Sequence, residues 1–544
     1  MATVLPNYPH TTTGKLSTGL AGIVGLLGMT LFSPSAFAVS CDFRNGDVFK
    51  EICGYIAAGD VQIGGQLKLH VASTTSDFSV HMRRAGNQNS SLQSVSLSGA
   101  GNHNPAPNSY NGLNWGSAFS VNIPANWTSG IYEVSLNNGK GDYSEFVAIK
   151  SAQPGSHSKV LILDSLPTKV AYSPIGGKSM YGFNSTNGAS PEVSTERPTG
   201  RGQWAEHREF VSWLDQQGIA YEAASMMDLH RDPSLLGHYN LVMLVGHNEY
   251  WSKEMRDNWD NYLAAGGNGA IFSGNTMWWQ VRFSADNKHM ICYKNANNDP
   301  LKSDNSRVTT NWFTSPVNRP ENLSTGVSFR HGGYANYTEG GINHYLNEGF
   351  TVTDASHWAF EGTGLSNQGI FGHKTVGYEV DGALFKMVNG KPVVTGEDGT
   401  PTNFQVLATT PAYAINSPFL TPGILPNNHG NQGWGTLGVF KPTTTSGTVF
   451  VAPTISWGTG LSDPQVAQIT RNVIERLKYR TQETPSPSGN TNSGATTNTS
   501  TSTNNTSSEP QIAASTNAGG GGSLPLSAVL LGLLAIFGLK ARKP

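Results

Sequence analysis

The stretch Leu241-Val242-Met243-Leu244-Val245-Gly246-His247-Asn248-Glu249-Tyr250-Trp251-Ser252 decides the fold of this chain. Its first five residues form a continuous apolar run, which is typical of a parallel strand buried on both faces. A helical pattern follows at 253–265, and a further apolar run stands at 269–272. A strand, a helix and a strand in this order predict a parallel sheet.

The same alternation continues on both sides of this stretch. Val160-Leu161-Ile162-Leu163 is a second continuous apolar run, a helical pattern covers 205–217, and 219–222 predicts a short strand. Towards the C-terminus, 447–452 predicts a strand and 464–478 a helix, which would complete the same sheet. We therefore predict a doubly wound α/β domain, in which ligands bind at the carboxyl ends of the strands.

Composition and periodicity set the boundaries of the folded body. We assign 156–484 to the α/β domain, and we expect 285–440, rich in Gly, Asn and aromatic residues, to be a β-rich insertion. Residues before this domain instead alternate apolar and polar types in short runs such as 66–71 and 78–82, separated by Gly, Asn, Ser and Pro. This period-two pattern predicts an N-terminal immunoglobulin-like β-sandwich over 39–155.

The two ends of the chain differ from the folded body. Residues 1–38 combine a cation, an apolar run and the small-residue sequence Ser35-Ala36-Phe37-Ala38, which predicts a secretory signal peptide. Residues 485–518 are a Ser/Thr/Asn linker that cannot bury a core, so we expect disorder there. Residues 519–544 run from a Gly-rich segment through an apolar stretch to a basic cluster, which physically suits a short membrane anchor.

The order of features in 519–544 resembles the GlyGly-CTERM sorting signal of Gram-negative bacteria. This resemblance implies transient anchoring in the inner membrane, cleavage by a rhomboid-type protease and release to the cell surface or medium. A plain uncleaved anchor is the alternative. Both interpretations predict that the folded body is exported.

Composition excludes several classes of protein. The chain has 37 Asp and Glu against 35 Lys and Arg, with no basic stripe to hold phosphates, so nucleic-acid binding is not expected. Three cysteines are too few for a disulfide scaffold. Cys41 and Cys53 could close one short loop in an oxidising compartment, which would leave Cys292 as a buried apolar residue.

Polar side chains follow three of the predicted strands where they end. His247 and Glu249 follow 241–245, Asn275 follows 269–272, and a Gly-rich loop with Tyr172 and Tyr181 follows 160–163. The carboxyl ends of parallel strands meet at one edge of a sheet, so we expect these side chains to gather. Each also has an ordinary structural role, because a loop tyrosine usually packs its ring and Glu249 could cap the following helix.

Standard catalytic motifs do not fit this arrangement. The strand-to-helix turn that holds a nucleophilic Ser or Cys in other α/β enzymes holds Glu249 here. His247-Asn248-Glu249 matches half of a zinc deaminase signature, but its P-C-x-x-C partner is missing, and the sequence has no H-E-x-x-H, P-loop or G-x-G-x-x-G. A carboxylate among phenols is a hard oxygen-donor set, which suits Fe(III) better than zinc.

The block from 241–252 through Gly274-Asn275-Thr276-Met277-Trp278-Trp279-Gln280-Val281-Arg282-Phe283 resembles the large (β) subunit of N,N-dimethylformamidase and its relatives. Residues 376–382 and 447–458 share this resemblance, which spans about 58–480. The family implies a β-sandwich joined to an amidotransferase-like (flavodoxin-like) α/β domain. It also implies a mononuclear Fe(III), held by two tyrosinates and one glutamate, and hydrolysis of an amide carbon–nitrogen bond other than a peptide bond.

The resemblance also assigns roles to residues. By position, the metal ligands would be Tyr132, Tyr172 and Glu249. Because the loop at Tyr172 continues Ser-Pro-Ile, unlike the expected family pattern, Tyr181 competes with Tyr172 as a ligand.

Three further residues would complete the catalytic site. His247 and Asn275 would place the substrate or a water molecule, and Glu379 would be an additional acid or base.

We therefore expect an exported, iron-dependent hydrolase of a small-molecule or polymer-linked amide, which could form a homo-oligomer. The family's separate small subunit is not encoded in this sequence, and the substrate is not assumed to be dimethylformamide. Two alternatives remain open: a surface-displayed, non-catalytic binding protein that keeps the fold, and an iron enzyme that consumes oxygen. Metal analysis separates the binding protein from the enzymes, and amine release separates the two enzymes.

Overall fold

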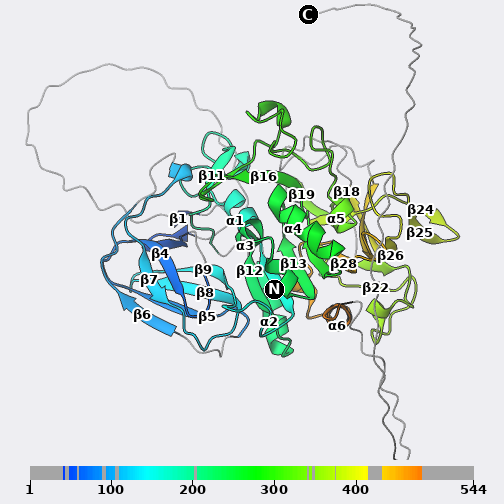
Figure 1. Cartoon of the computed structure of the whole chain (residues 1–544), viewed down its shortest axis with the longest axis horizontal. Coiled ribbons are helices and arrows are strands. Elements are labelled where there is room, and N and C mark those ends of the chain that lie inside the picture. The colour runs from blue at the N-terminus through cyan, green and yellow to red at the C-terminus, as the bar shows by residue number, and fades with distance from the viewer. Residues whose placement is uncertain are drawn as a thin grey trace, which may run out of the picture. The chain divides into compact units, whose positions relative to one another are not determined.

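Short runs of β-branched and aromatic residues make this chain mostly β-sheet with few helices, as the computed structural model shows (Figure 1). The structure describes residues 41–42, 48–57, 61–87, 93–103, 109–200, 205–339, 342–345, 349–373, 375–413 and 432–480. All of them belong to the first of two units, 1–485. The predicted signal peptide (1–38), linker (485–518) and sorting tail (519–544) lie outside the described residues.

Two antiparallel sheets form the N-terminal part of the described chain. The first has the strand order β3 (Ile52–Ile56), β4 (Gln66–Ser73), β7 (Phe119–Asn122), and the second β6 (Gln93–Leu97), β5 (Phe78–Arg84), β8 (Gly130–Asn137), β9 (Asp142–Ile149). Along β4 the alternation predicted from sequence is present, because Leu67 and Leu69 are buried and Gln66 and Lys68 are exposed. Apolar residues of both sheets form one buried cluster. The immunoglobulin-like assignment stays a prediction.

The cysteines fit the expected pattern in part. Cys53 in β3 is disulfide-bonded. Cys292 is a free, buried thiol. The side chain of Cys41 lies outside the described residues, so the expected Cys41–Cys53 pairing stays a prediction.

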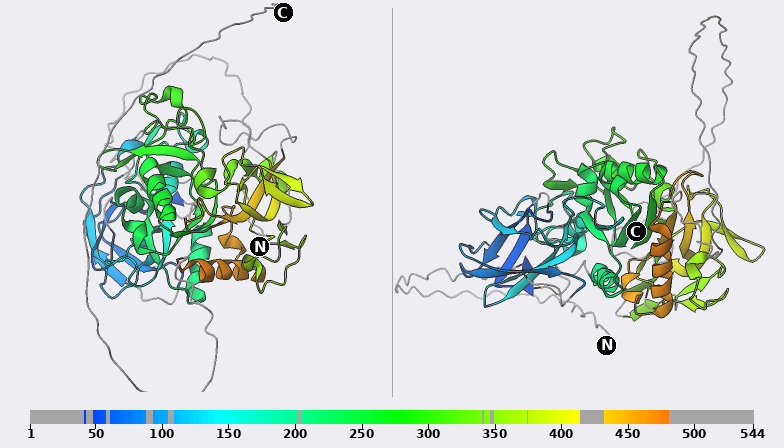
Figure 2. Two further views of the ribbon diagram at one scale, coloured as in Figure 1. Left: turned by 45° about the vertical axis from the view of Figure 1, so that its right-hand side comes forward. Right: turned by 60° about the horizontal axis from the view of Figure 1, so that its bottom comes forward.

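A mixed sheet forms the centre of the molecule, in the order β12-β10-β13-β15-β28-β27-β26-β18-β23. Five neighbouring strands of it are parallel: β12 (Glu222–Ser225), β10 (Val160–Asp164), β13 (Leu241–His247), β15 (Asn268–Gly274) and β28 (Val449–Ala452). Every residue of β10, β13 and β15 is buried. The sandwich packs beside β12 (Figure 2), where the Ala223 amide donates to Ser129 Oγ over 2.9 Å.

Helices cover both faces of these parallel strands, and this explains their continuous apolar runs. On β13, Val242 and Leu244 belong to one apolar cluster with helix α4 (Lys253–Ala264). Met243 and Val245, which point the other way, belong to a second cluster with α2 (Ala205–Gln216) and α6 (Pro464–Leu477). Because successive side chains alternate between the faces, both sets must be apolar. The name flavodoxin-like for this arrangement stays a prediction.

Strand β12 begins three residues later than the sequence predicts. Helix α2 ends at Gln216. Gly218, which follows it, has a left-handed φ of +66°, and the Ile219 amide donates back to the Leu214 carbonyl over 3.0 Å. This is the hydrogen bond of a Schellman helix end, so 219 belongs to the helix terminus rather than to the strand.

The segment expected as an insertion at 285–440 contributes strands to the central sheet itself. β27 (Gln432–Phe440) pairs with β28, and the sheet continues antiparallel through β26 (Gln405–Tyr413), β18 (Ser328–Tyr334) and β23 (Glu379–Gly382). The expected β structure is therefore present, but it extends the sheet. Shorter elements flank it: β21 (Phe350–Val352), β22 (Ile370–Phe371), the hairpins β19 (Asn336–Glu339) with β20 (Ile342–Tyr345) and β24 (Phe385–Val388) with β25 (Lys391–Val394), and helix α5 (Asn322–Thr325).

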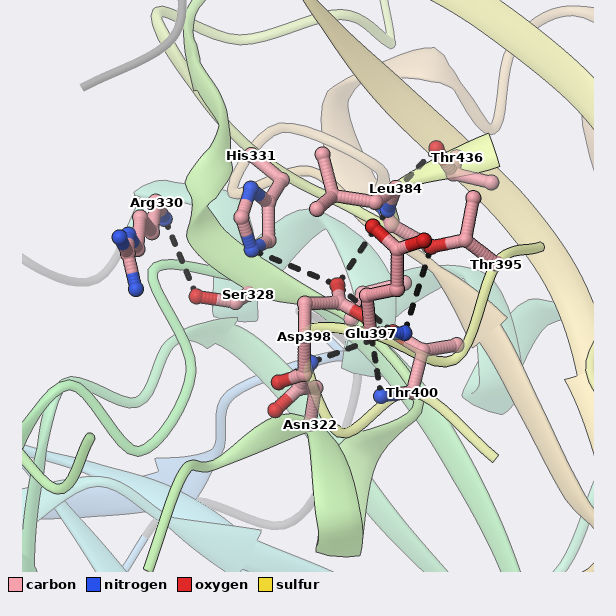
Figure 3. Close-up of polar contacts among 12 residues, drawn as sticks. Asn322, Ser328, Arg330, His331, Leu384, Thr395, Glu397, Asp398, Thr400 and Thr436 are labelled. Carbon is pink, nitrogen blue, oxygen red and sulfur yellow. Dashed lines mark hydrogen bonds and ion pairs between the residues drawn. The ribbon is translucent and has the colours of Figure 1, made fainter. Parts of the chain in front are cut away.

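A contact between His331 and Asp398 ties β18 to the loop that follows β25 (Figure 3). His331 Nε2 lies 3.3 Å from Asp398 Oδ2, and the Asp398 carboxylate also accepts hydrogen bonds from the amides of Leu384 and Thr400. The Asp398 oxygens are thus occupied by the chain's own amides. We assign this pair a role in loop structure.

A small sheet of β11 (Glu192–Ser194), β17 (His289–Ile291), β16 (Trp279–Phe283) and β14 (Tyr250–Ser252) lies next to the carboxyl ends of β13 and β15. Its position follows from the chain, since β14 follows β13 and β16 follows β15.

None of the helices in the described residues is long and apolar enough to cross a membrane.

The buried Glu321 makes a pH dependence of stability testable. Burial raises its pKa to about 7, while Ser328 donates to Oε1. Between pH 4.5 and 7 the folded protein therefore holds a proton that the unfolded chain has lost, so this contribution to stability falls as pH rises. From pH 5 to 8.5 the loss should be about 2–3 kcal/mol.

The variant Glu321→Gln, which cannot ionise, isolates this effect. We expect its free energy of unfolding in urea to fall less than that of the wild type between pH 5 and 8.5, by about 2–3 kcal/mol. Equal pH slopes for the two proteins would show that Glu321 is ionised in the folded state.

Candidate functional site

The turn after β13 holds Glu249 inside the protein. Gly246 has a left-handed φ of +74°, after which Asn248 Nδ2 donates back to the Val245 carbonyl over 2.9 Å. The Glu249 amide donates to Thr168 Oγ1 in α1 (Leu166–Tyr172) over 3.0 Å. Glu249 is 2% exposed. The turn and α1 thus fix a carboxylate at the carboxyl end of the parallel strands.

Three hydrogen-bond donors converge on the Glu249 carboxylate. Tyr181 Oη donates to Oε1 over 2.6 Å and Trp279 Nε1 donates to the same oxygen over 2.8 Å. Tyr172 Oη donates to Oε2 over 2.9 Å. The rings of Tyr172 and Tyr181 stack, with centroids 4.3 Å apart. The structure therefore brings both tyrosines of the 172–181 loop to Glu249.

His247, Asn275 and Glu379 form the second part of this cluster. His247 Nε2 lies 3.0 Å from Glu379 Oε2 and 3.5 Å from Glu249 Oε2. Asn275 Nδ2 donates to Glu379 Oε1 over 3.4 Å. The three residues come from the ends of β13, β15 and β23, so the sheet gathers them as the sequence predicts.

The predicted ligand Tyr132 lies elsewhere. It is in strand β8 of the sandwich, where its hydroxyl donates to the Thr128 carbonyl over 2.8 Å and its ring stacks on Trp127 at 4.6 Å. The two phenols at the carboxylate are therefore Tyr172 and Tyr181, and Tyr132 does not lie beside them. Which tyrosines bind a metal stays a prediction. Spacing along the sequence suggested Tyr132, whereas its own strand turns it into the sandwich core.

Lys294 is a site residue that the sequence did not indicate. Its ammonium lies 3.3 Å from the ring centroid of Tyr181 and within 5.4 Å of those of Tyr250 and Trp279. Nζ has no hydrogen-bond partner among the described residues, so the aromatic faces stabilise its charge. Lys294 lies in no recognisable sequence motif. Trp279, the other neighbour of Glu249 that was not predicted, at least belongs to the stretch 274–283 that carries the family resemblance.

Burial governs the ionisation of this cluster. It raises the pKa of Glu249, and the neighbouring His247 and Lys294 lower it again in part. The pKa values of Tyr172 and Tyr181 lie well above the usual 10, first because of burial and second because of the Glu249 charge. Both phenols thus hold their protons at neutral pH and donate them to the carboxylate. Burial also lowers the pKa of Lys294 to about 8.

Asp381 positions the loop that carries Asn275. Its two carboxylate oxygens accept the amides of Asn275 and Thr276 over 2.8 and 3.1 Å. Asn275 and Met277 have left-handed φ values of +49° and +57°, which cost free energy unless the surroundings fix them. Since Asp381 and Glu379 alternate with Val380 on β23, one strand face supplies both carboxylates.

The oxygen donors suit a hard metal ion. The phenol oxygens of Tyr172 and Tyr181 each lie within hydrogen-bond distance of one oxygen of the Glu249 carboxylate, and a cation bound there would take the place of the two phenol protons. Among the described residues, no three His, Cys, Asp or Glu side chains gather so as to hold a metal. A metal centre here therefore depends on the phenols.

Comparison with known proteins identifies relatives. The family described as N,N-dimethylformamidase beta subunit-like, C-terminal, matches residues 79–471. Relatives include the N,N-dimethylformamidase beta subunits of Paracoccus aminophilus, 24% identical over 306 residues, and of an Alcaligenes species, 23% identical over 306 residues. Each match covers 51% of this chain but only 37% of the relative, so this chain spans just over a third of their length.

Solved structures give a much weaker comparison. A β-D-glucuronidase of Dictyoglomus thermophilum matches with a TM-score of 0.13 and 7% identity, over 45% of this chain and 50% of that one. A Bacteroides uniformis β-glucuronidase 2 matches with a TM-score of 0.12 and 11% identity, over 42% and 28%. Scores of this size carry no argument about fold or function.

The hydrogen bond from Tyr181 to Glu249 can be tested in the metal-free protein. Tyr181→Phe removes a donor to a buried carboxylate, so the free energy of unfolding in urea should fall by about 1.5–3 kcal/mol. Tyr250→Phe is the control, because Tyr250 is equally buried but Tyr181, not Tyr250, donates to the Glu249 carboxylate. It should lower stability clearly less than Tyr181→Phe does. Equal losses in both variants would contradict the hydrogen bond.

Proposed function

Because this chain belongs to the N,N-dimethylformamidase beta subunit-like family, we propose that it is an iron-dependent hydrolase of an amide carbon–nitrogen bond other than a peptide bond. The observation that carries the proposal is the convergence of two phenols on one buried carboxylate, beside a His–Glu pair. The names of the relatives point to an amide substrate. Their low identity and partial coverage leave the substrate of this chain open.

Tyr172, Tyr181 and Glu249 would hold the metal, which we take to be a mononuclear Fe(III). When bound, such an ion supplies Lewis acidity toward an amide oxygen and toward water. The Trp279 indole fixes the carboxylate by its hydrogen bond to Oε1, and the Lys294 ammonium lies on the face of the Tyr181 ring. These neighbours hold the three oxygens together and partly offset their negative charge.

His247 and Glu379 would move protons. Their 3.0 Å contact, between two side chains that are 7% and 4% exposed, provides a proton path to a departing amine. Asn275 orients Glu379 through Nδ2, and its Oδ1 has no partner among the described residues. That oxygen can accept an N–H of an amide substrate, or position the amine product.

Burial favours a small substrate group. Glu249, Tyr181, His247 and Glu379 are buried, and Tyr172 is partly buried. An exposed side chain close to them is Phe183, which is 51% exposed with its ring 5.4 Å from that of Tyr181. The site thus lies about one aromatic ring below the surface. A small-molecule amide, or a short amide on a polymer side chain, suits this depth better than a folded protein does.

We also propose that the protein acts outside the cytoplasm and within an oligomer. The first proposal rests on the signal-peptide and sorting patterns at 1–38 and 519–544. The second rests on the relatives, which are named as beta subunits.

Iron analysis of purified full-length chain tests the metal ligands. We expect about one iron per chain and a visible tyrosinate-to-iron charge-transfer band. Tyr172→Phe, Tyr181→Phe and Glu249→Gln should lose the band and most of the metal. Tyr132→Phe is the matched control and should keep both, because Tyr132 lies in the sandwich. Loss of iron in the Tyr132 variant, or a folded wild type without iron, would contradict the proposal.

His247→Gln separates binding from turnover. We expect it to retain iron and the band, because His247 is not among the proposed ligands, while amine release from simple amides falls by about 10²–10⁴-fold. An iron-loaded wild type that releases no amine but consumes oxygen would instead support the oxygen-using alternative.

A further inference from the structure

A cavity lies where the sandwich meets the central sheet. It has a volume of about 80 Å³ and is lined by Phe146 and Ala148 of β9, Met227 of α3 (Met226–Arg231) and, at the end of β10, Asp164. The loop residue Arg197 also lines it. No residue of the Glu249 cluster belongs to the described lining, so this cavity is separate from the proposed metal centre.

Arg197 is buried without a counter-ion among the described residues. It is 2% exposed, and only its Nη2 makes hydrogen bonds, to the carbonyls of Ser173, Ile175 and Lys178 at 2.5, 2.5 and 2.7 Å. Its Nε and Nη1 have no partner among the described residues. Burial alone accounts for the lowering of its pKa to about 9, and no acid offsets it.

Most of the other charges around the cavity are paired. Asp164 Oδ2 accepts from Lys169 over 3.0 Å, although its Oδ1 has no partner in the described residues. Asp228 pairs with Arg231 over 2.9 Å, whereas the Glu145 carboxylate accepts hydrogen bonds from the neutral donors Tyr143 and Thr199. Arg197 is thus the lining cation that makes no ion pair among the described residues.

A buried guanidinium without an ion pair is costly, since removing a charge from water is repaid only by an opposite charge and by hydrogen bonds. Water in the cavity would satisfy the N–H groups of Arg197 but would not balance its charge. A volume of about 80 Å³ accommodates several waters, which corresponds to a solute of about six heavy atoms. The apolar side chains of Phe146 and Met227 favour a carbon skeleton over a bare inorganic anion.

We propose that this junction cavity binds a small carboxylate that carries a hydroxyl or amino group. Arg197 Nε and Nη1 bind the carboxylate, Asp164 Oδ1 accepts the hydrogen bond of the second group, and Phe146 and Met227 contact the carbon atoms. This site does not rest on the proposed hydrolase activity. Because Arg197 also holds the loop between Tyr172 and Tyr181, the two sites share one structural element.

Ligand-dependent thermal unfolding of the full-length chain tests the proposal, with sodium lactate, propionate and chloride at equal ionic strength. A ligand that binds only the folded state raises the unfolding temperature with its concentration. We expect a saturable rise with lactate, at least tenfold weaker apparent binding with propionate, and no saturable rise with chloride. Lactate behaving like chloride would overturn the proposal, and propionate binding as tightly as lactate would overturn the role of Asp164.

Two variants keep the test specific. Ala148→Leu fills the cavity and leaves the Arg197 contacts in place, so the lactate effect should vanish while the ligand-free protein stays folded. Arg197→Lys keeps a cation but loses the Nε and Nη1 donors, and lactate binding should weaken at least tenfold. If Ala148→Leu is folded and shows the same lactate effect as the wild type, lactate acts elsewhere and the proposal fails. If Arg197→Lys does not fold, the comparison of Ala148→Leu with the wild type decides alone.

Discussion

The site depends on one buried carboxylate. Glu249 is almost completely removed from water, and a charge there persists only if donors surround it. Two phenols and an indole provide those donors, and they come from the end of α1, the loop after it and the start of β16. Each of these segments must therefore hold its position for the carboxylate to stay charged, which links the fold around the sheet edge to the chemistry of the site.

The parallel sheet makes this convergence possible. Strands β10, β13 and β15 are neighbours and end at the same edge, so the residues that follow them meet although they are far apart in sequence. Antiparallel β23 brings Glu379 and Asp381 to the same place from the other part of the sheet. Rigid strands position the reactive groups, and the strained turn at Asn275 is fixed by hydrogen bonds to Asp381.

Sequence patterns predicted the strands that carry the site, because an apolar run buried on both faces is a strong local signal. The gathering of His247, Asn275 and Glu249 followed from strand ends alone. Tyr132 was assigned by its position in the family resemblance. The sequence also placed it in the predicted sandwich at 39–155, but it did not show that its side chain packs into that core, away from Glu249. Lys294 and Arg197 could not be predicted, since a lysine or arginine in a loop is normally solvated. Only the tertiary structure buries the Arg197 side chain and encloses the Lys294 ammonium. The antiparallel extension of the sheet by β26 and β27 could not be predicted either, because short β-like runs do not specify which strands pair in the folded protein.

The central claim is that Glu249, Tyr172 and Tyr181 surround a single metal ion. Anomalous X-ray scattering, measured at the iron absorption edge on crystals of the iron-containing full-length protein, tests it most directly. The account predicts one anomalous peak, in contact with the Glu249 carboxylate and both phenol oxygens. A peak at another position, such as beside Tyr132, or crystals of folded protein without an iron peak would contradict it.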